Sequence, residues 1–165
     1  GTLVRLMGDA ILAFFDPLDA PLHHTMRQAL RCSLEMQQTM SKVNVSDAEM
    51  AVHPLNLGVG LHAGEVVVGN IGSQQRLEYT PIGDAVNVAS RLCGVAPGGV
   101  CYIGARTREL LGDRVKPADV LHLKLKGKAE PVEIYELRPV SSIWLTISRA
   151  MRSKAFWAEW RLPDS

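Results

Sequence analysis

The distribution of apolar positions predicts a strand pair at the start of the chain and a long helix after it. Leu3 to Met7 and Ala10 to Phe15 are two mostly apolar runs, and Gly8-Asp9 separates them. A glycine beside an aspartate between two strand-like runs is typical of the tight turn of a hairpin. From Leu22 to about Val43 apolar residues recur at helical spacing, which predicts an amphipathic helix packed on the core.

The rest of the chain predicts strands that alternate with shorter helices. Leu55 to His62 and Glu65 to Ile71 predict a second hairpin around Ala63-Gly64. The remaining predicted elements are a strand–turn–helix from Glu78 to Arg91, a strand from Val100 to Ile103, a helix from Ala105 to Leu111, and strands from Val120 to Leu125 and Val132 to Leu137. The order ββαββαβαββ predicts an α+β domain with a mixed sheet and helices packed on it.

The stretch from Glu78 to Arg91, EYTPIGDAVNVASR, combines a chain break with two polar side chains on one helix face. The strand-like residues break at Pro81 and Gly83, and a helix is expected from Asp84. Asn87 and Arg91 are four residues apart and therefore lie one above the other on that helix. An amide beside a guanidinium at a helix start could hold a sugar–phosphate, and the alternative is an ordinary helix with both side chains in solvent.

Composition indicates one soluble domain without a bulk preference for nucleic acid. The chain has 165 residues, 47% hydrophobic and 21% charged, with a formal net charge of +1. Its three cysteines show no CxxC spacing, which favours small buried residues in a reducing compartment over a disulfide frame. No apolar run reaches membrane-spanning length and no signal peptide opens the chain. We therefore expect a cytoplasmic domain, cut from a longer protein because it begins at Gly1, with any membrane attachment lying in other parts of the parent.

A shift in composition at Arg138-Pro139 divides the chain into a predicted domain, residues 1–140, and a tail, residues 141–165. Within the tail apolar residues recur at helical spacing, at Trp144, Ile147, Met151, Ala155 and Ala158. This pattern fits a helix that binds a membrane surface or a partner. The interpretation that we prefer is a linker or an ordered tail that leads to another domain.

Four motifs, in this order and at this spacing, resemble the catalytic domain of the class III nucleotide cyclases, the adenylyl and guanylyl cyclases. They are RLMGD at Arg5 to Asp9, GLHAGEVVVGNIG at Gly60 to Gly72, GDAVNVASR at Gly83 to Arg91, and LKGK at Leu125 to Lys128. The resemblance covers most of the chain from Leu3 to Leu137 and is of the bacterial type. One such motif would be weak, whereas four in register are specific.

The resemblance implies a ferredoxin-like nucleotide cyclase fold that works as a head-to-tail homodimer, with ATP bound at the interface between two cyclase domains. The implied reaction is attack of the ribose 3′-hydroxyl on the α-phosphate, which gives cyclic AMP and pyrophosphate. Such phosphoryl chemistry consists mostly of positioning and charge neutralisation. Two Mg²⁺ or Mn²⁺ ions in each active site are implied, and these ions prefer oxygen ligands.

The resemblance also assigns roles to single residues. Asp9 corresponds to the second of the family's two metal-binding aspartates, Asn87 to the residue that orients the ribose, and Arg91 to the residue that stabilises charge on the α-phosphate. Lys126 corresponds to the lysine that holds the terminal phosphates. The alternatives are that Asp9 only forms a turn and that Lys126 is only a solvated turn cation.

By the same resemblance, Arg5 and Thr80 fall at the two positions that select the base. Both depart from the residues most common there, so the alternative that they do not contact the base stays open. Adenine offers an acceptor at N1 and a donor at its exocyclic amine, which a guanidinium donor and a hydroxyl acceptor complement. Guanylyl enzymes of the family place a Glu and typically a Cys at these positions, whereas the usual adenylyl pair is Lys and Asp. Thr80 resembles many bacterial adenylyl cyclases, and Arg5 is a less usual replacement for Lys. ATP is therefore favoured over GTP.

The resemblance places the family's first metal-binding aspartate on a strand before the position of Gly1. We therefore expect this chain by itself to lack one metal-binding carboxylate and to be inactive, or nearly so. The competing hypothesis is a degenerate cyclase-homology domain that binds nucleotide or a partner domain and regulates without catalysis. The presence of Asp9, Asn87, Arg91 and Lys126 favours the enzyme. A plain interaction module fits the tail better than the body.

Overall fold

The computed structural model describes residues 1–46, 52–73, 76–113, 115–126, 129–138 and 157–161. Its strands are β1 (Thr2–Met7), β2 (Ala10–Phe14), β3 (Asn56–Leu61), β4 (Val67–Ser73), β5 (Arg76–Ile82), β6 (Cys101–Gly104), β7 (Asp119–Leu123), β8 (Val132–Leu137) and β9 (Trp157–Arg161). Its helices are α1 (Leu22–Ser46), α3 (Asp84–Val95) and α4 (Ala105–Leu111). No helix within these ranges is long and apolar enough to cross a membrane.

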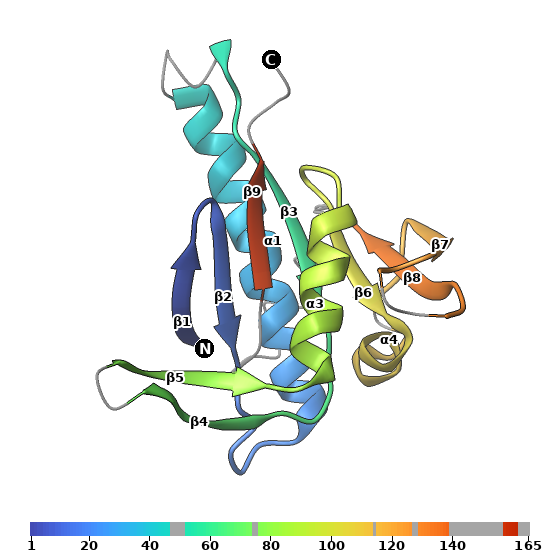
Figure 1. Cartoon of the computed structure of the whole chain (residues 1–165). Coiled ribbons are helices and arrows are strands. Elements are labelled where there is room, and N and C mark those ends of the chain that lie inside the picture. The colour runs from blue at the N-terminus through green and yellow to red at the C-terminus, as the bar shows by residue number, and fades with distance from the viewer. Residues whose placement is uncertain (47–51, 74–75, 114, 127–128, 139–156, 162–165) are drawn as a thin grey trace.

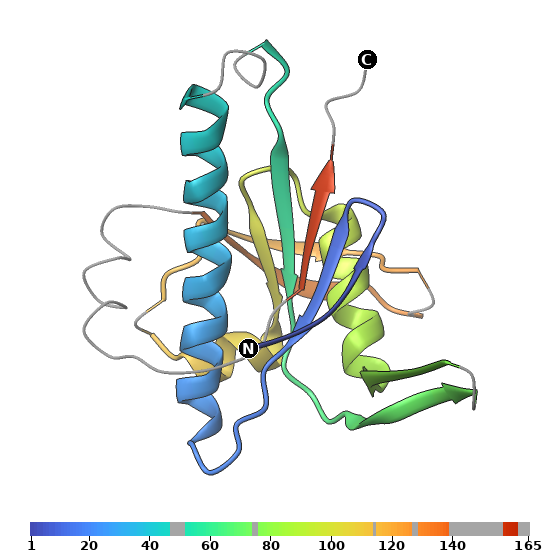
Figure 2. The ribbon, with the colours of Figure 1, turned by 90° about the vertical axis from the view of Figure 1, so that its left-hand side faces the viewer.

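Seven strands form one mixed sheet in the order β1-β2-β9-β3-β6-β8-β7, while β4 and β5 form a separate two-stranded sheet. Strands β3 and β6 run parallel, and the other neighbouring strands run antiparallel. Figure 2 shows the large sheet between α1 on one face and α3 on the other, and Figure 1 shows β4 and β5 projecting from this body. The predicted α+β class, with a mixed sheet and helices packed on it, is confirmed.

The two faces of β3 explain why helices cover both sides of the sheet. Leu57, Val59 and Leu61 are buried in the cluster that α1 contributes to, which also contains residues of α4 and β6. The alternate positions Gly58 and Gly60 turn to the other face and meet the backbone of α3. Because successive side chains of a strand point to opposite faces, β3 presents branched side chains to one helix and bare backbone to the other.

Two local predictions are wrong. Strands β3 and β4 do not form a hairpin around Ala63-Gly64, because β4 pairs with β5 in register from Val67↔Ile82 to Ser73↔Arg76. Likewise the chain does not break at Pro81, since β5 continues to Ile82. A proline is tolerated there because each strand of a two-stranded sheet has a free edge.

The C-terminal prediction is also corrected where the structure describes it. The expected helix stripe included Ala158, but residues 157–161 form β9, which pairs antiparallel with β2 and with β3. Ala158 lies in register with Ile11 on one side and Val59 on the other. The other stripe positions, Trp144 to Ala155, lie outside the described residues, and the domain boundary at residue 140 stays a prediction.

Candidate functional site

Helix α3 rests directly on the backbone of β3. A Cβ added to Gly60 would lie 2.2 Å from the carbonyl oxygen of Ala89 and 2.3 Å from the amide nitrogen of Cys93, both in α3. A Cβ added to Gly58 would lie 2.5 Å from the carbonyl oxygen of Ala96. Such distances leave no space for any side chain. The glycines of β3 therefore fix how closely α3 approaches the sheet.

This seating turns Asn87 and Arg91 away from the sheet. Val88 and Leu92 are buried in a cluster with Tyr102 and Ile134 of the sheet, whereas Asn87 is exposed and Arg91 is half-buried. The start of α3 at Asp84, after Gly83, is as predicted. The structure thus presents an amide and a guanidinium, one helical turn apart, on the outer face of a firmly seated helix.

Lys126 follows a residue that packs beneath the same helix. Leu125, its chain neighbour, is 2% exposed and belongs to the cluster that contains Val88 and Leu92 of α3. Lys126 itself is exposed. The packing of Leu125 therefore fixes the backbone that carries this exposed cation, and the phosphate role of Lys126 stays a prediction.

The two candidate base-selecting residues are linked by a residue that the sequence analysis did not single out. Arg5 of β1 donates from Nη1 to Oε2 of Glu78 on β5, at 2.9 Å. Thr80 lies two residues after Glu78 and is 9% exposed. Because residues i and i+2 of a strand share a face, the ion pair brings the Arg5 guanidinium to the strand face that carries Thr80. A carboxylate two positions before Thr80 is the only sequence signal for this contact.

Asp9 occupies the predicted turn between β1 and β2 and is exposed. The preceding Gly8 has a φ of 63°, which suits glycine. Within the described parts of the chain Asp9 makes no hydrogen bond or ion pair with the other candidate residues, and no group of three His, Cys, Asp or Glu could hold a metal ion. The carboxylate is the right chemistry for Mg²⁺ or Mn²⁺, but one carboxylate does not complete a site for two ions. The described residues of one chain therefore do not fit a full two-metal centre.

A cavity of about 500 Å³ lies beside the first turns of α3. Its walls come from β2, the end of β3, α1 and α3 and are mostly apolar. The acidic and basic residues in these walls are Asp16, His62, Glu65 and Arg106. The cavity lining therefore carries no excess of positive charge of the kind that binds a triphosphate.

Comparison with known proteins identifies the family. The sequence model described as "Adenylate and Guanylate cyclase catalytic domain" matches residues 2–139. Adenylate cyclase 1 of Rhizobium meliloti is 32% identical over 140 residues, which are 83% of this chain and 21% of that protein. The adenylate cyclase of Anabaena cylindrica is 33% identical over 147 residues, which are 84% of this chain and 28% of that protein. The chain thus spans about a quarter of the length of these relatives.

Solved structures show the same relationship in three dimensions. The guanylyl cyclase Cya2 superposes with a TM-score of 0.74 and 36% identity, covering 82% of this chain and 68% of that one. The adenylyl cyclase CyaB from P. aeruginosa superposes with a TM-score of 0.76 and 29% identity, covering 82% of this chain and 70% of that one. The chain therefore belongs to the adenylate and guanylate cyclase catalytic domains, the class III nucleotide cyclases.

Proposed function

We propose that this domain converts ATP to 3′,5′-cyclic AMP and pyrophosphate. The ribose 3′-oxygen forms a bond to the α-phosphorus, its proton passes to solvent, and the bond from the α-phosphorus to pyrophosphate breaks. The observation that carries the proposal is the close packing of α3 on the glycines of β3, which holds Asn87 and Arg91 one helical turn apart on the outer face of the helix. Fixed polar groups of this kind are what an intramolecular phosphoryl transfer needs.

Each of these side chains has a proposed role that its chemistry suits. The Asn87 amide orients the ribose so that the 3′-oxygen approaches the α-phosphate in line. The Arg91 guanidinium, which presents several N–H donors in a plane, stabilises the charge on the α-phosphate oxygens. Lys126 neutralises the terminal phosphates. None of these roles requires the residue to be buried, and Asn87 and Lys126 are exposed in one chain.

The choice of ATP rests on Arg5 and Thr80, because the matched relatives and structures bear both adenylyl and guanylyl names. The guanidinium donates to the adenine N1 acceptor, and the Thr80 hydroxyl accepts from the exocyclic amine. Glu78 holds the Arg5 guanidinium on the face of β5 that carries Thr80, at an Nη1–Oε2 distance of 2.9 Å.

The proposed partner is a second copy of the domain, with the active sites at the interface. Large apolar side chains are exposed on β1 and on the β4–β5 hairpin. They are Leu3, Leu6, Met7, Val67, Ile71, Leu77, Tyr79 and Ile82, with exposed fractions from 37% to 73%. Apolar side chains gathered on two projecting hairpins are typical of a protein–protein contact. This surface supports the homodimer that the family resemblance implies.

The proposed reaction uses Mg²⁺ or Mn²⁺, two ions in each site, with Asp9 as one ligand. When bound, the ions would neutralise phosphate charge and lower the pKa of the 3′-hydroxyl. Since the described residues provide only one suitable carboxylate, we derive no step through the ions. The second candidate function is a regulatory cyclase-homology domain that binds nucleotide without turning it over.

The experiment measures cyclic AMP and cyclic GMP formation by the complete protein that contains this chain, with Mn²⁺ and either ATP or GTP. We expect cyclic AMP from ATP, and a fall in kcat of about 100-fold for Asn87→Ala, because an oriented transition-state contact is lost. Ser90→Ala, an exposed position on the same helix, is the matched control and keeps full activity. If the wild-type protein binds ATP without turning it over, the catalytic function is contradicted and the regulatory function takes its place.

A further inference from the structure

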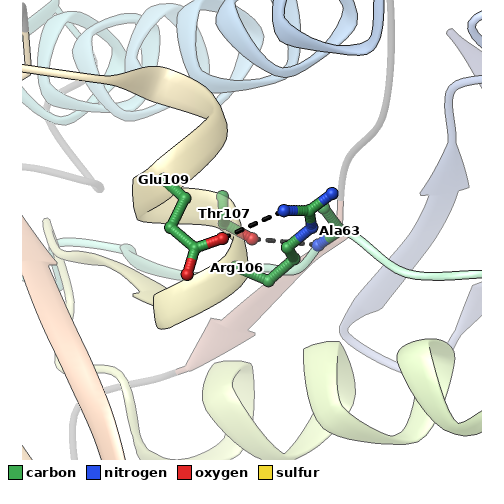
Figure 3. Close-up of polar contacts among 4 residues, drawn as sticks. All are labelled: Ala63, Arg106, Thr107 and Glu109. Carbon is green, nitrogen blue, oxygen red and sulfur yellow. Dashed lines mark hydrogen bonds and ion pairs between the residues drawn. The ribbon is translucent and has the colours of Figure 1, made fainter.

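Thr107 is fully buried at the start of α4, where its hydroxyl joins this helix to the end of β3. The Oγ1 atom accepts a hydrogen bond from the amide of Ala63 at 2.9 Å and donates a longer one to the carbonyl oxygen of Leu61 at 3.5 Å. Figure 3 shows the bond to Ala63 next to the ion pair between Arg106 and Glu109. That ion pair is solvent-exposed, whereas the Thr107 hydroxyl has no access to water to replace its partners.

The segment that Thr107 holds lies directly against the start of α3. A Cβ added to Gly64 would lie 2.6 Å from the Cβ of Ala85, in the first turn of α3. A Cβ added to Gly83, the residue before the helix, would lie 2.8 Å from the carbonyl oxygen of Glu65. These distances leave no room for a side chain at Gly64 or at Gly83. A shift of residues 63–65 would therefore be passed to the first turn of α3 rather than absorbed.

We propose that Thr107 is a positioning residue for the nucleotide chemistry. Its hydroxyl fixes Ala63, the chain after Ala63 fixes the first turn of α3, and that turn carries Asn87. The inference rests on the proposed function, since it gives Thr107 an effect on the ribose contact. Misplacement of a reacting group by about 1 Å can cost roughly 100-fold in rate, so a single buried hydroxyl far from the nucleotide has a measurable effect.

The test compares Thr107→Val, which keeps the shape and removes the hydroxyl, with Thr107→Ser, which keeps the hydroxyl. In the complete protein, Thr107→Val lowers kcat for ATP 10- to 100-fold and changes KM less than about threefold, because positioning acts in the transition state. The Thr107→Ser variant, which keeps the hydroxyl, is expected to retain a kcat within about threefold of the wild-type value. Thr39→Val, at an exposed position of α1, is the matched control and leaves kcat unchanged.

Amide hydrogen exchange gives a readout that does not depend on turnover. In Thr107→Val we expect faster exchange at Ala63 and at Val88 and Ala89, the first α3 amides with a partner inside the helix, but not in α1. If the wild-type protein neither binds nor cyclises nucleotide, the proposed function fails, and the exchange comparison alone decides the positioning role. Unchanged exchange at Val88 and Ala89 overturns it.

The kinetic outcomes separate positioning from stability alone. A folded Thr107→Val protein with a lower melting temperature but the wild-type kcat overturns the proposal. If Thr107→Val does not fold, Gly64→Ala tests the same path from the other side, because its methyl group meets the Cβ of Ala85. Gly64→Ala is expected to lower kcat at least 10-fold with Thr107 intact, and an undiminished kcat in this variant also overturns the proposal.

Discussion

The candidate site draws on two regions that are built in opposite ways. Helix α3 is pressed on the sheet with backbone against backbone and presents Asn87 and Arg91. The hairpins β1–β2 and β4–β5, which carry Asp9, Arg5 and Thr80, are connected to each other by surface contacts. One contact is the ion pair between Arg5 and Glu78, whose side chains are 46% and 31% exposed, and the other is the tilted ring contact between Phe14 and Tyr79.

The difference indicates which part of the candidate site one chain positions by itself and which part remains exposed at its surface. The residues proposed for the ribose and the α-phosphate take their positions from glycines and buried side chains of the same chain. The residues proposed for the base stand on hairpins that expose apolar side chains to solvent. A second domain that covers these hairpins would exclude water from the base site. The positions of Asn87 and Arg91 do not depend on such a second domain, because α3 is packed on the sheet of its own chain.

The largest expected effect comes from disrupting the close packing of α3 on β3. Gly60→Ala places a methyl carbon 2.2 Å from the Ala89 carbonyl oxygen, and backbone on both sides leaves nothing that can move aside. We expect a loss of about 3 kcal/mol or more in the free energy of unfolding, measured by urea denaturation. Gly69→Ala, in β4, has no atom within 4 Å of the added Cβ and is the matched control. Equal stability of the two variants would contradict the close seating of α3.

The seat of α3 also shows why only part of the fold was predictable from the sequence. The helix start at Gly83-Asp84, the turn at Gly8-Asp9 and the bounds of α4 are local signals, and the structure confirms them. Gly64 instead suggested a hairpin turn, because a glycine required by a distant contact with Ala85 looks the same as a turn glycine in the sequence. The pairing of β9 with β2 and β3 is likewise non-local, so the spacing of apolar residues could not reveal it.

The candidate site follows the same division. Asn87 and Arg91 were predicted from their spacing in one helix, and the structure places them on one outer face. Glu78 was missed because its partner Arg5 is 73 residues away in the sequence. Lys126 was assigned by resemblance, and the structure adds only that it is exposed beside Leu125, which is buried in the cluster beneath α3. The arrangement of residues within one helix was predictable from the sequence, whereas contacts between residues of two different elements were not.

The second prediction tests whether the exposed apolar side chains on β1 and the β4–β5 hairpin form a contact between two copies of the domain. Val67→Lys on β4 places a charge on the exposed apolar surface, and we expect it to weaken self-association roughly 30-fold, because a charge buried in an apolar contact is left unpaired. Analytical ultracentrifugation over a concentration series measures the dissociation constant. Val45→Lys, at an exposed position near the end of α1, is the control with the same change of residue and leaves association unaltered. Equal association of both variants would remove the hairpins from the interface.

The third prediction tests whether water is excluded from the core between α1 and the sheet, where Cys101 of β6 is buried. Burial raises the pKa of the Cys101 thiol from 9.0 to about 12, while a hydrogen bond from Ser33 opposes the shift. Because the folded state holds the proton more tightly, the contribution of this thiol to stability is complete below pH 9 and is lost as pH rises toward 12. At pH 10 the wild-type protein should lose about 1 kcal/mol relative to its stability at pH 8, in excess of the loss in Cys101→Ala. Parallel pH profiles of unfolding free energy would show that water reaches the thiol.

The smallest expected effect concerns the contact between the two hairpins. An exposed ion pair contributes about 0.2–1 kcal/mol, so Glu78→Gln should leave the free energy of unfolding almost unchanged. The same substitution frees the Arg5 guanidinium from the face of β5 that carries Thr80. We therefore expect the preference for ATP over GTP, measured as the ratio of kcat/KM values, to fall about 1.5- to 5-fold, because about 0.2–1 kcal/mol of orientation is lost. Glu109→Gln breaks the exposed ion pair with Arg106 and is the matched control. If Glu78→Gln leaves the preference for ATP unchanged while Arg5→Ala removes it, Arg5 reaches the base without help from Glu78. The hairpins that carry Arg5 and Thr80 are then oriented by the second domain.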